Sequence, residues 1–161
     1  MTETTKFEEP WVLWYFDPRK NDWSFSNYKL VAEIRTPQQF WSIVPEIPRK
    51  AFECGYFFFM RKGVRPIWEV PENEHGGSWS KKIPTSDVYD TAIDLMINAA
   101  LELIILTGNN KKFVGISTSA KGEFNIVKLW TSAPIPKPSL NIHTKLSITD
   151  DVVFTLHKTR R

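Results

Sequence analysis

A run of four aromatic residues opens the segment YFFFMR at residues 56–61. A short apolar run of this length predicts a β-strand rather than a helix. Successive side chains of a strand point to opposite faces of its sheet, so a run without polar alternation predicts burial on both faces. Whatever fold the chain adopts must therefore cover this strand on both sides.

Several other segments carry strand patterns, and turn residues separate them. Residues 28–35, YKLVAEIR, alternate apolar and polar side chains, as a half-buried strand does. Lys121 and Gly122 are typical of a tight turn between two further strands. Besides 56–61, the expected strands lie at 11–16, 28–35, 67–69, 78–83, 113–120, 124–130 and 151–157.

The segment 36–48 predicts a short helix. Thr36 suits the N-cap and Pro37 suits the first helical position. Pro45 and Pro48 stop the helix. A longer helix is expected over the apolar run 88–106, with Ser86 as its N-cap and Gly108 at its C-terminal cap.

Four polar residues recur at every fourth position of that apolar run and predict a polar stripe along one helix face. A segment that crosses a membrane would not carry such a stripe, so no membrane association is expected. The four residues are Asp90, Asp94, Asn98 and Glu102.

The order of elements, mostly strands with two inserted helices, predicts an α+β fold with an antiparallel sheet and helices on one face. With 161 residues, the chain is long enough for one domain with its own core. We expect a single domain at 11–161, preceded by a flexible arm at 1–10.

The net charge and the cysteine content limit which ligands and which cellular compartment suit the chain. A formal net charge of +3 is too small to neutralise the many phosphates of a long nucleic acid, although it suits one short anionic ligand. Cys54 is alone, so no internal disulfide can form, and the polar N-terminus shows no signal peptide. Both observations favour the cytoplasm. The three histidines are scattered, and we expect neither a metal nor a cofactor.

Three tryptophans stand where a core would not need them. Trp23 lies in a loop, Trp68 precedes a loop, and Trp130 ends a strand. Two indoles on separate loops can sandwich a flat ligand, with stacking worth about 1–3 kcal/mol per base and more for a cationic base. Glu69 can accept two hydrogen bonds from the adjacent N1 and N2 donors of guanine.

The same residues have structural explanations. Trp11, Trp14 and Trp79 suit core packing in strands, and helical spacing alone would also place Trp41 in the core. Trp23 and Trp68 could anchor loops over the end of the sheet. Glu69 could pair with Arg65 at the surface, where an ion pair contributes little.

The motifs WVLWYF (11–16), DW and YKLV (22–31), FW (40–41), PIWE…GGSW (66–79), SDV (86–88), AKG (120–122) and LWT (129–131) follow one another in a familiar order. In this the chain resembles the eukaryotic translation initiation factor 4E family, which binds the 7-methylguanosine cap of messenger RNA.

The resemblance implies a curved antiparallel sheet with helices on its convex face and the cap on its concave face. Trp23 and Trp68 match the indoles that sandwich the base, and Glu69 matches the carboxylate that reads guanine. Trp130 matches the indole beside the N7-methyl group. These matches imply that the protein is not an enzyme, and no metal cluster or positioned nucleophile suggests otherwise.

The chain differs from the family in the residues expected to bind the phosphates of the cap, because Ser78 and Ser119 stand where the family has arginines. Lys121 matches a family lysine near the phosphates. Lys128 lies two residues before Trp130, which places both side chains on one face of a strand. Lys81 and Lys82 are weaker candidates. We expect a site that depends more on stacking and less on phosphate charge than is usual for the family.

A second surface is implied on the helical side. Trp41, Ile93, Asp94 and Ile97 match the residues that dock a partner helix with a Tyr-x-x-x-x-Leu-hydrophobic motif. The partner could be a scaffold initiation factor or a repressor, and the chain is expected to act as a monomer. Two alternatives stay open: a translational repressor or divergent paralogue that binds the cap, and an interaction module that has lost cap affinity.

Overall fold

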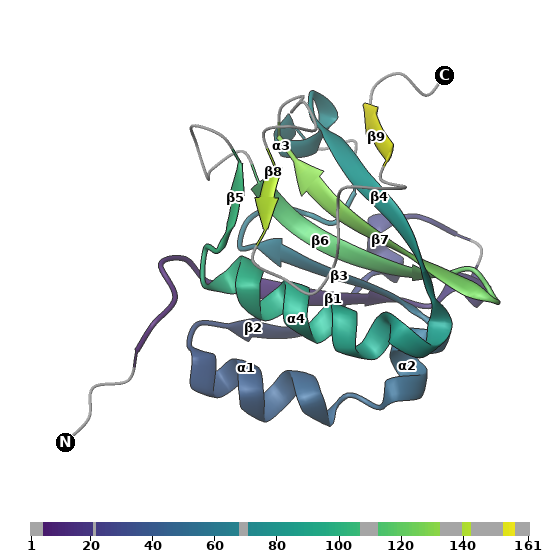
Figure 1. Cartoon of the computed structure of the whole chain (residues 1–161), viewed down its shortest axis with the longest axis horizontal. Helices are drawn as coiled ribbons and strands as arrows, with labels where there is room; N and C mark the ends of the chain where they lie inside the picture. The colour runs from purple at the N-terminus through teal and green to yellow at the C-terminus, as the bar shows by residue number, and fades with distance from the viewer. Residues whose placement is uncertain are drawn as a thin grey trace.

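The computed structural model of the chain describes residues 5–20, 22–67, 71–106, 113–132, 140–142 and 153–156. Seven strands form one antiparallel sheet in the order β2-β1-β3-β6-β7-β4-β9, and β5 pairs with β8 in a small second sheet (Figure 1). The strands are β1 Trp11–Phe16, β2 Lys29–Ile34, β3 Tyr56–Arg61, β4 Gly77–Pro84, β5 Ile104–Leu106, β6 Phe113–Ala120, β7 Phe124–Thr131, β8 Leu140–Ile142 and β9 Val153–Leu156.

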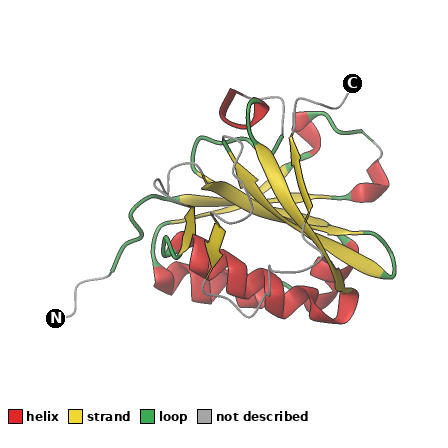
Figure 2. Ribbon diagram, turned by 45° about the horizontal axis from the view of Figure 1, so that its top comes forward, coloured by secondary structure: helices red, strands yellow, loops and turns green. Residues whose placement is uncertain are grey.

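The three longest helices of the described chain, α1 (Pro37–Ile43), α2 (Arg49–Cys54) and α4 (Val88–Ala100), lie together on one face of the large sheet (Figure 2). The short α3 (Pro71–Glu74) lies between β3 and β4. The predicted α+β class, with an antiparallel sheet and helices on one face, is confirmed. We call this face the helical face and the opposite one the open face. No described helix combines the length and apolarity needed to cross a bilayer.

Burial of β3 on both faces is confirmed, because all six of its residues are buried. Phe57 and Phe59 belong to the large core between the sheet and the helices. Tyr56, Phe58 and Met60 alternate with them and join a smaller aromatic cluster on the open face. The sheet therefore separates two apolar clusters, and β3 contributes to both.

Helix α1 begins as predicted. The Thr36 hydroxyl accepts a hydrogen bond from the Gln39 backbone N–H at 3.1 Å, and Pro37 takes the first helical position. The helix ends at Ile43 and a 3₁₀ turn follows at Val44–Glu46. Sequence patterns missed α2, which the prolines of the preceding segment concealed.

Both predicted caps of the long helix were wrong. Asp87 rather than Ser86 occupies the N-cap of α4, after a 3₁₀ turn at Thr85–Asp87. The helix ends at Ala100, well before Gly108, which lies outside the described residues.

A Schellman motif closes α4 with a residue other than glycine. The backbone N–H of Glu102 donates to the Ala99 carbonyl (3.0 Å), and that of Leu103 donates to the Asn98 carbonyl (2.8 Å). Glu102 has a positive φ of 60°, a conformation that costs a side-chain-bearing residue roughly 1–2 kcal/mol. Glu102 therefore ends the helix and does not continue its polar stripe.

Arg61 holds this turn in place. Its guanidinium donates to the Glu102 carboxylate at 2.7 and 2.9 Å, to Glu9 at 2.7 Å and to the Phe113 carbonyl at 2.7 Å. Burial lowers the pKa of Arg61, but the ion pairs with Glu102 and Glu9 outweigh it and leave the pKa raised, so the charge is retained. The sequence assigned residues 7–10 to a flexible arm. In the structure, the bond between Arg61 and Glu9 and the burial of Phe7 in the core hold these residues in place.

Candidate functional site

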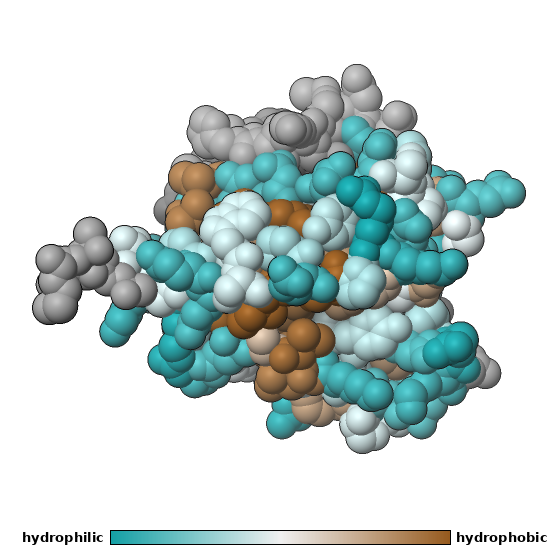
Figure 3. Space-filling view, turned by 90° about the horizontal axis from the view of Figure 1, so that it is seen from below, coloured by the Kyte–Doolittle hydropathy of each residue, from teal (hydrophilic) through white to brown (hydrophobic). Residues whose placement is uncertain are grey.

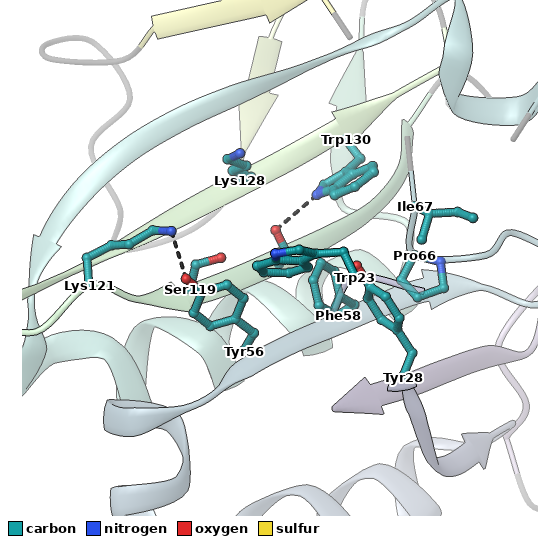
Figure 4. Close-up of a pocket in the computed structure, with 11 residues that line it drawn as sticks. Trp23, Tyr28, Tyr56, Phe58, Pro66, Ile67, Ser119, Lys121, Lys128 and Trp130 are labelled. Carbon is teal, nitrogen blue, oxygen red and sulfur yellow. Dashed lines mark hydrogen bonds between the residues drawn. The ribbon is translucent and has the colours of Figure 1, made fainter. Parts of the chain in front are cut away.

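A pocket of about 320 Å³ opens on the open face of the sheet (Figure 4). Aromatic rings form much of its wall, and hydroxyl and ammonium groups lie along one part of it. The described residues that line it come from β3, β6, β7, the β6–β7 turn, the loop between β1 and β2, and the segment after β3. They are Trp23, Tyr28, Tyr56, Phe58, Pro66, Ile67, Ser117, Ser119, Lys121, Lys128 and Trp130.

Trp23 forms one side of the pocket. Its ring stacks on Phe16, with centroids 4.1 Å apart and planes 7° from parallel, and the residue remains 52% exposed. Asp22 shapes the loop that carries it, because its carboxylate accepts hydrogen bonds from the Ser24 hydroxyl (2.7 Å) and backbone N–H (3.0 Å). These bonds hold the pKa of Asp22 below its usual value. The indole is thus both a loop anchor and an exposed ring beside the pocket.

Trp130 forms a second aromatic wall. It is buried in β7, and its indole N–H donates to the Ser117 hydroxyl at 3.0 Å (Figure 4). Its ring meets Phe58 edge-on, with centroids 6.2 Å apart. Because the polar edge is satisfied within the protein, the apolar part of the ring is available to the pocket.

Two lysines supply the positive charge of the described pocket lining. Lys128 lies two residues before Trp130 in β7, and both line the pocket, as their spacing predicts. Lys121 lies in the β6–β7 turn, where Gly122 has a positive φ of 93°. Its ammonium donates to the Tyr56 hydroxyl at 2.8 Å. The two cations reach the pocket from different elements.

Trp68 and Glu69 lie outside the described residues, so their predicted roles stay predictions. The two residues directly before them, Pro66 and Ile67, line the pocket. Ile67 lies in a bend and not in the strand expected at 67–69.

Asn73 holds the segment that leads to Trp68. Its side-chain amide is fully buried and donates to the carbonyls of Arg65 (3.1 Å) and Ile67 (2.8 Å). The Asn73 carbonyl in turn accepts from the Gly76 N–H at 3.0 Å. A Cβ at Gly76 would lie 1.7 Å from the Thr131 carbonyl oxygen, so only glycine fits there. The loop between β3 and β4 is thereby braced against the end of β7.

Ser78 and Ser119, which stand where the family has arginines, differ in their surroundings. Ser119 lines the pocket, directly opposite Tyr56 across β3 and β6. Ser78 is buried opposite Trp130 and is absent from the described pocket lining. Lys81 and Lys82, the weaker candidates for phosphate ligands, line a groove on the helical face instead. Their position does not support a role in phosphate binding.

Several pocket residues escaped sequence analysis. Tyr28, Tyr56, Phe58 and Ser117 all line the pocket. The alternation of side chains along β3 and β6 could have grouped Tyr56 with Phe58, yet an all-aromatic run does not reveal which face holds the helices.

The groove on the helical face measures about 650 Å³ and joins all four residues predicted to bind a partner. Trp41 of α1 is 52% exposed, which excludes core packing, and Phe40 beneath it is buried. Ile93, Asp94 and Ile97 contribute one side of α4. Seen from this side, apolar surface lies between hydrophilic flanks (Figure 3).

Trp11 and Trp79 are core residues as expected, whereas Trp14 is half-buried and packs against the open-face cluster.

The sequence model of the eukaryotic initiation factor 4E family matches residues 6–159. The chain belongs to this family. The resemblance read from the motifs is thereby confirmed. Because the family is one of initiation factors, the prediction of a non-enzymatic protein is confirmed as well.

Individual relatives are distant. Eukaryotic translation initiation factor 4E-2 of Schizosaccharomyces pombe is 27% identical over 135 residues, which cover 80% of this chain and 54% of that protein. The chain therefore spans about half the length of this curated relative.

Two solved structures share the fold. The C. elegans eIF4E-3 complex with the 4E-binding protein Mextli has a TM-score of 0.80 at 19% identity and covers 98% of this chain and 96% of that one. The Ascaris suum eIF4E-3 complex with m7G cap has a TM-score of 0.70 at 20% identity and covers 94% and 98%.

Proposed function

We propose that this protein binds the 7-methylguanosine cap of messenger RNA in the open-face pocket and a partner helix in the groove of the helical face. The observation that carries the proposal is the pocket itself. It joins an exposed indole, Trp23, a second indole, Trp130, and two ammonium groups in a chain of the initiation factor 4E family.

The base would stack between Trp23 and Trp68. Each ring attracts a cationic methylated base by about 0.5–2 kcal/mol beyond ordinary stacking. Glu69 would accept hydrogen bonds from guanine N1 and N2, at about 1.5–3 kcal/mol for bonds to a charged group. Trp130 would contact the methyl group. The stacking of Trp23 on Phe16 supports this arrangement, because it fixes the plane of the indole before the ligand arrives.

Lys121 and Lys128 would bind the phosphates. A lysine supplies a point charge without the two-pronged geometry of arginine. Ser119 adds a small neutral group to the same part of the pocket. Stacking should therefore contribute a larger share of the affinity, and phosphate charge a smaller one, than is usual for the family.

The partner would be a scaffold initiation factor or a repressor whose helix carries the Tyr-x-x-x-x-Leu-hydrophobic motif. Trp41, Ile93 and Ile97 offer apolar contacts, and Asp94 offers an acceptor for a basic residue. The related C. elegans structure contains the 4E-binding protein Mextli. We propose that the protein acts as a cytoplasmic monomer. Activation and repression of translation are distinguished by which partner it recruits.

Tryptophan fluorescence during titration tests the cap site. We expect 7-methyl-GTP to quench the wild-type protein strongly and GTP to quench it weakly, because only the methylated base is cationic. Trp23→Ala should abolish binding of 7-methyl-GTP. Trp41→Ala is the matched control, since this indole is equally exposed on the opposite face. Equal quenching by both nucleotides, or unchanged binding by Trp23→Ala, would refute the cap site.

A synthetic peptide with the Tyr-x-x-x-x-Leu-hydrophobic motif tests the groove. Trp41→Ala should weaken peptide binding at least tenfold, because truncating a central aromatic residue of an interface commonly costs about 2 kcal/mol or more. Trp23→Ala should leave it unchanged. A protein that binds the peptide but no methylated nucleotide would instead be the interaction module without cap affinity.

A further inference from the structure

Tyr56 and Lys121 form a pair inside the open-face pocket. The Lys121 ammonium lies 2.8 Å from the Tyr56 hydroxyl oxygen and 4.8 Å from the centroid of its ring (Figure 4). The two residues come from different elements, with Tyr56 at the start of β3 and Lys121 in the β6–β7 turn. Both line the pocket.

The direction of this hydrogen bond follows from the chemistry of the two groups. An ammonium group has three donors and no acceptor, so the Tyr56 oxygen must accept. The phenolic O–H proton is then left to be donated elsewhere. The ammonium also polarises the phenol, because hydrogen bonds that share a group strengthen one another. The pair therefore presents a neutral O–H donor beside a cation, a combination suited to an anionic oxygen.

The surroundings leave room for such a ligand. Tyr56 is only 8% exposed, so packing fixes its ring. Ser119 lies directly opposite it in β6 and lines the same pocket. Directly opposite side chains lie on the same face of a sheet, only about 4.5–5.5 Å apart at Cβ. Because serine is small, it takes up little of the pocket beside the phenol.

The pair also stands beside the ring proposed to stack the base. The Tyr56 and Trp23 centroids are 5.5 Å apart, and Phe16 contacts both rings. A ligand stacked on Trp23 would thus have Tyr56 and Lys121 beside it, where its substituents can reach them. In a nucleotide those substituents end in phosphate.

We propose that Tyr56 is a ligand-binding residue whose hydroxyl donates to a phosphate oxygen of the bound nucleotide, with Lys121 as its charged companion. The inference rests on the proposed cap site and adds a tyrosine to its phosphate contacts.

The test compares the affinities of 7-methyl-GTP and 7-methylguanosine nucleoside. Tyr56→Phe keeps the ring and removes only the hydroxyl, so it should weaken 7-methyl-GTP about tenfold or more, the usual loss for a hydrogen bond to a charged group. Nucleoside affinity should not change. Tyr89→Phe is the control, because it removes the hydroxyl of a tyrosine outside the pocket, on α4, where that hydroxyl donates to the Pro45 carbonyl. It should leave the affinity ratio of the two ligands at the wild-type value.

Two results would overturn the role of Tyr56: a wild-type affinity ratio in Tyr56→Phe, or an equal loss for both ligands. Tripolyphosphate, which has no base, separates this inference from the cap proposal. If the wild-type protein binds no methylated nucleotide, the cap proposal fails. In that case, the proposal that Tyr56 and Lys121 bind phosphate is retained only if tripolyphosphate meets two conditions. It must shift the NMR signals of Tyr56 and Lys121 in the wild type, and it must bind more weakly to Tyr56→Phe.

Discussion

At the scale of single residues, a few side chains set how much charge the open-face pocket presents. Its described cations are Lys121 and Lys128, and Lys121 is held by Tyr56. Ser119 is buried in β6, directly opposite Tyr56. Adding one positive charge at this position should raise the affinity for phosphate while the stacking of the base remains.

Ser119→Arg should strengthen binding of 7-methyl-GTP about tenfold or more, because a new guanidinium can form charge-assisted hydrogen bonds worth about 1.5–3 kcal/mol. It should also steepen the fall of affinity with salt, since exposed charges are screened. Titrations at several potassium chloride concentrations measure both effects. Ser86→Arg adds the same charge at an exposed position of the helical side and serves as control. A salt dependence equal to that of Ser86→Arg would show that Ser119 does not face the phosphates.

Sequence spacing could predict some of these side chains and not others. Lys128 and Trp130 share a face because they are two residues apart in one strand, and that rule needs no other part of the chain. Tyr56 could not be assigned to a face, because its neighbours in YFFFMR are as aromatic as it is. Its face follows from where α1, α2 and α4 pack, which is a property of the whole sheet.

At the scale of elements, the loop from β3 to β4 is braced from within. The buried amide of Asn73 joins two carbonyls before Trp68, and Gly76 packs against the Thr131 backbone. The loop thus has fixed points on both sides of Trp68 and Glu69 in the sequence. Its bracing should matter for cap affinity more than for the stability of the sheet.

Asn73→Asp should loosen this loop, because a carboxylate replaces the donors and faces the carbonyls of Arg65 and Ile67. Leaving such buried groups unsatisfied costs about 1–3 kcal/mol. Hydrogen exchange should accelerate in the loop, and affinity for 7-methyl-GTP should fall severalfold. Asn98→Asp is the control, since the Asn98 amide also donates to a backbone carbonyl, that of Asp94, but on α4 (2.7 Å). If both variants bind the nucleotide equally well, Asn73 does not position the pocket.

Element boundaries show where local patterns failed. The start of α1 followed from Thr36 and Pro37, since a cap involves only neighbouring residues. The end of α4 did not, because Glu102 takes a conformation usually left to glycine. Its carboxylate is held by Arg61, which is far away in the sequence. A local pattern does not contain that partner.

At the scale of the whole molecule, Arg61 joins parts of the chain that are distant in sequence. It links Glu9 near the N-terminus, the start of β6 at Phe113 and the turn after α4 at Glu102. The side chains of Arg61 and Glu102 are only 11% and 13% exposed, so little water replaces a lost partner. Removing one member of such a pair leaves a buried charge without compensation.

Arg61→Met should therefore lower the free energy of unfolding by about 3–5 kcal/mol, as other broken buried pairs do. Urea denaturation measures this loss. The control is Arg19→Met, because Arg19 pairs with Asp17 at the exposed surface, and its removal should leave stability unchanged. Adding Glu102→Gln to Arg61→Met should recover part of the loss by removing the buried charge. Equal stability of the two arginine variants would contradict this role.

The place of β4 in the sheet dictates when it can pair while the chain is being synthesised. Strands β1, β2 and β3 adjoin one another and can assemble soon after they leave the ribosome. Strand β4 is made next, yet its neighbours are β7 and β9, which follow only after α4. At about 5–20 residues per second, β4 stays without a partner strand for some seconds. The nascent chain thus completes the half of the sheet made of β1, β2 and β3 first. The β6–β7 hairpin joins β4 to that half once it has left the ribosome, because β6 pairs with β3 and β7 pairs with β4.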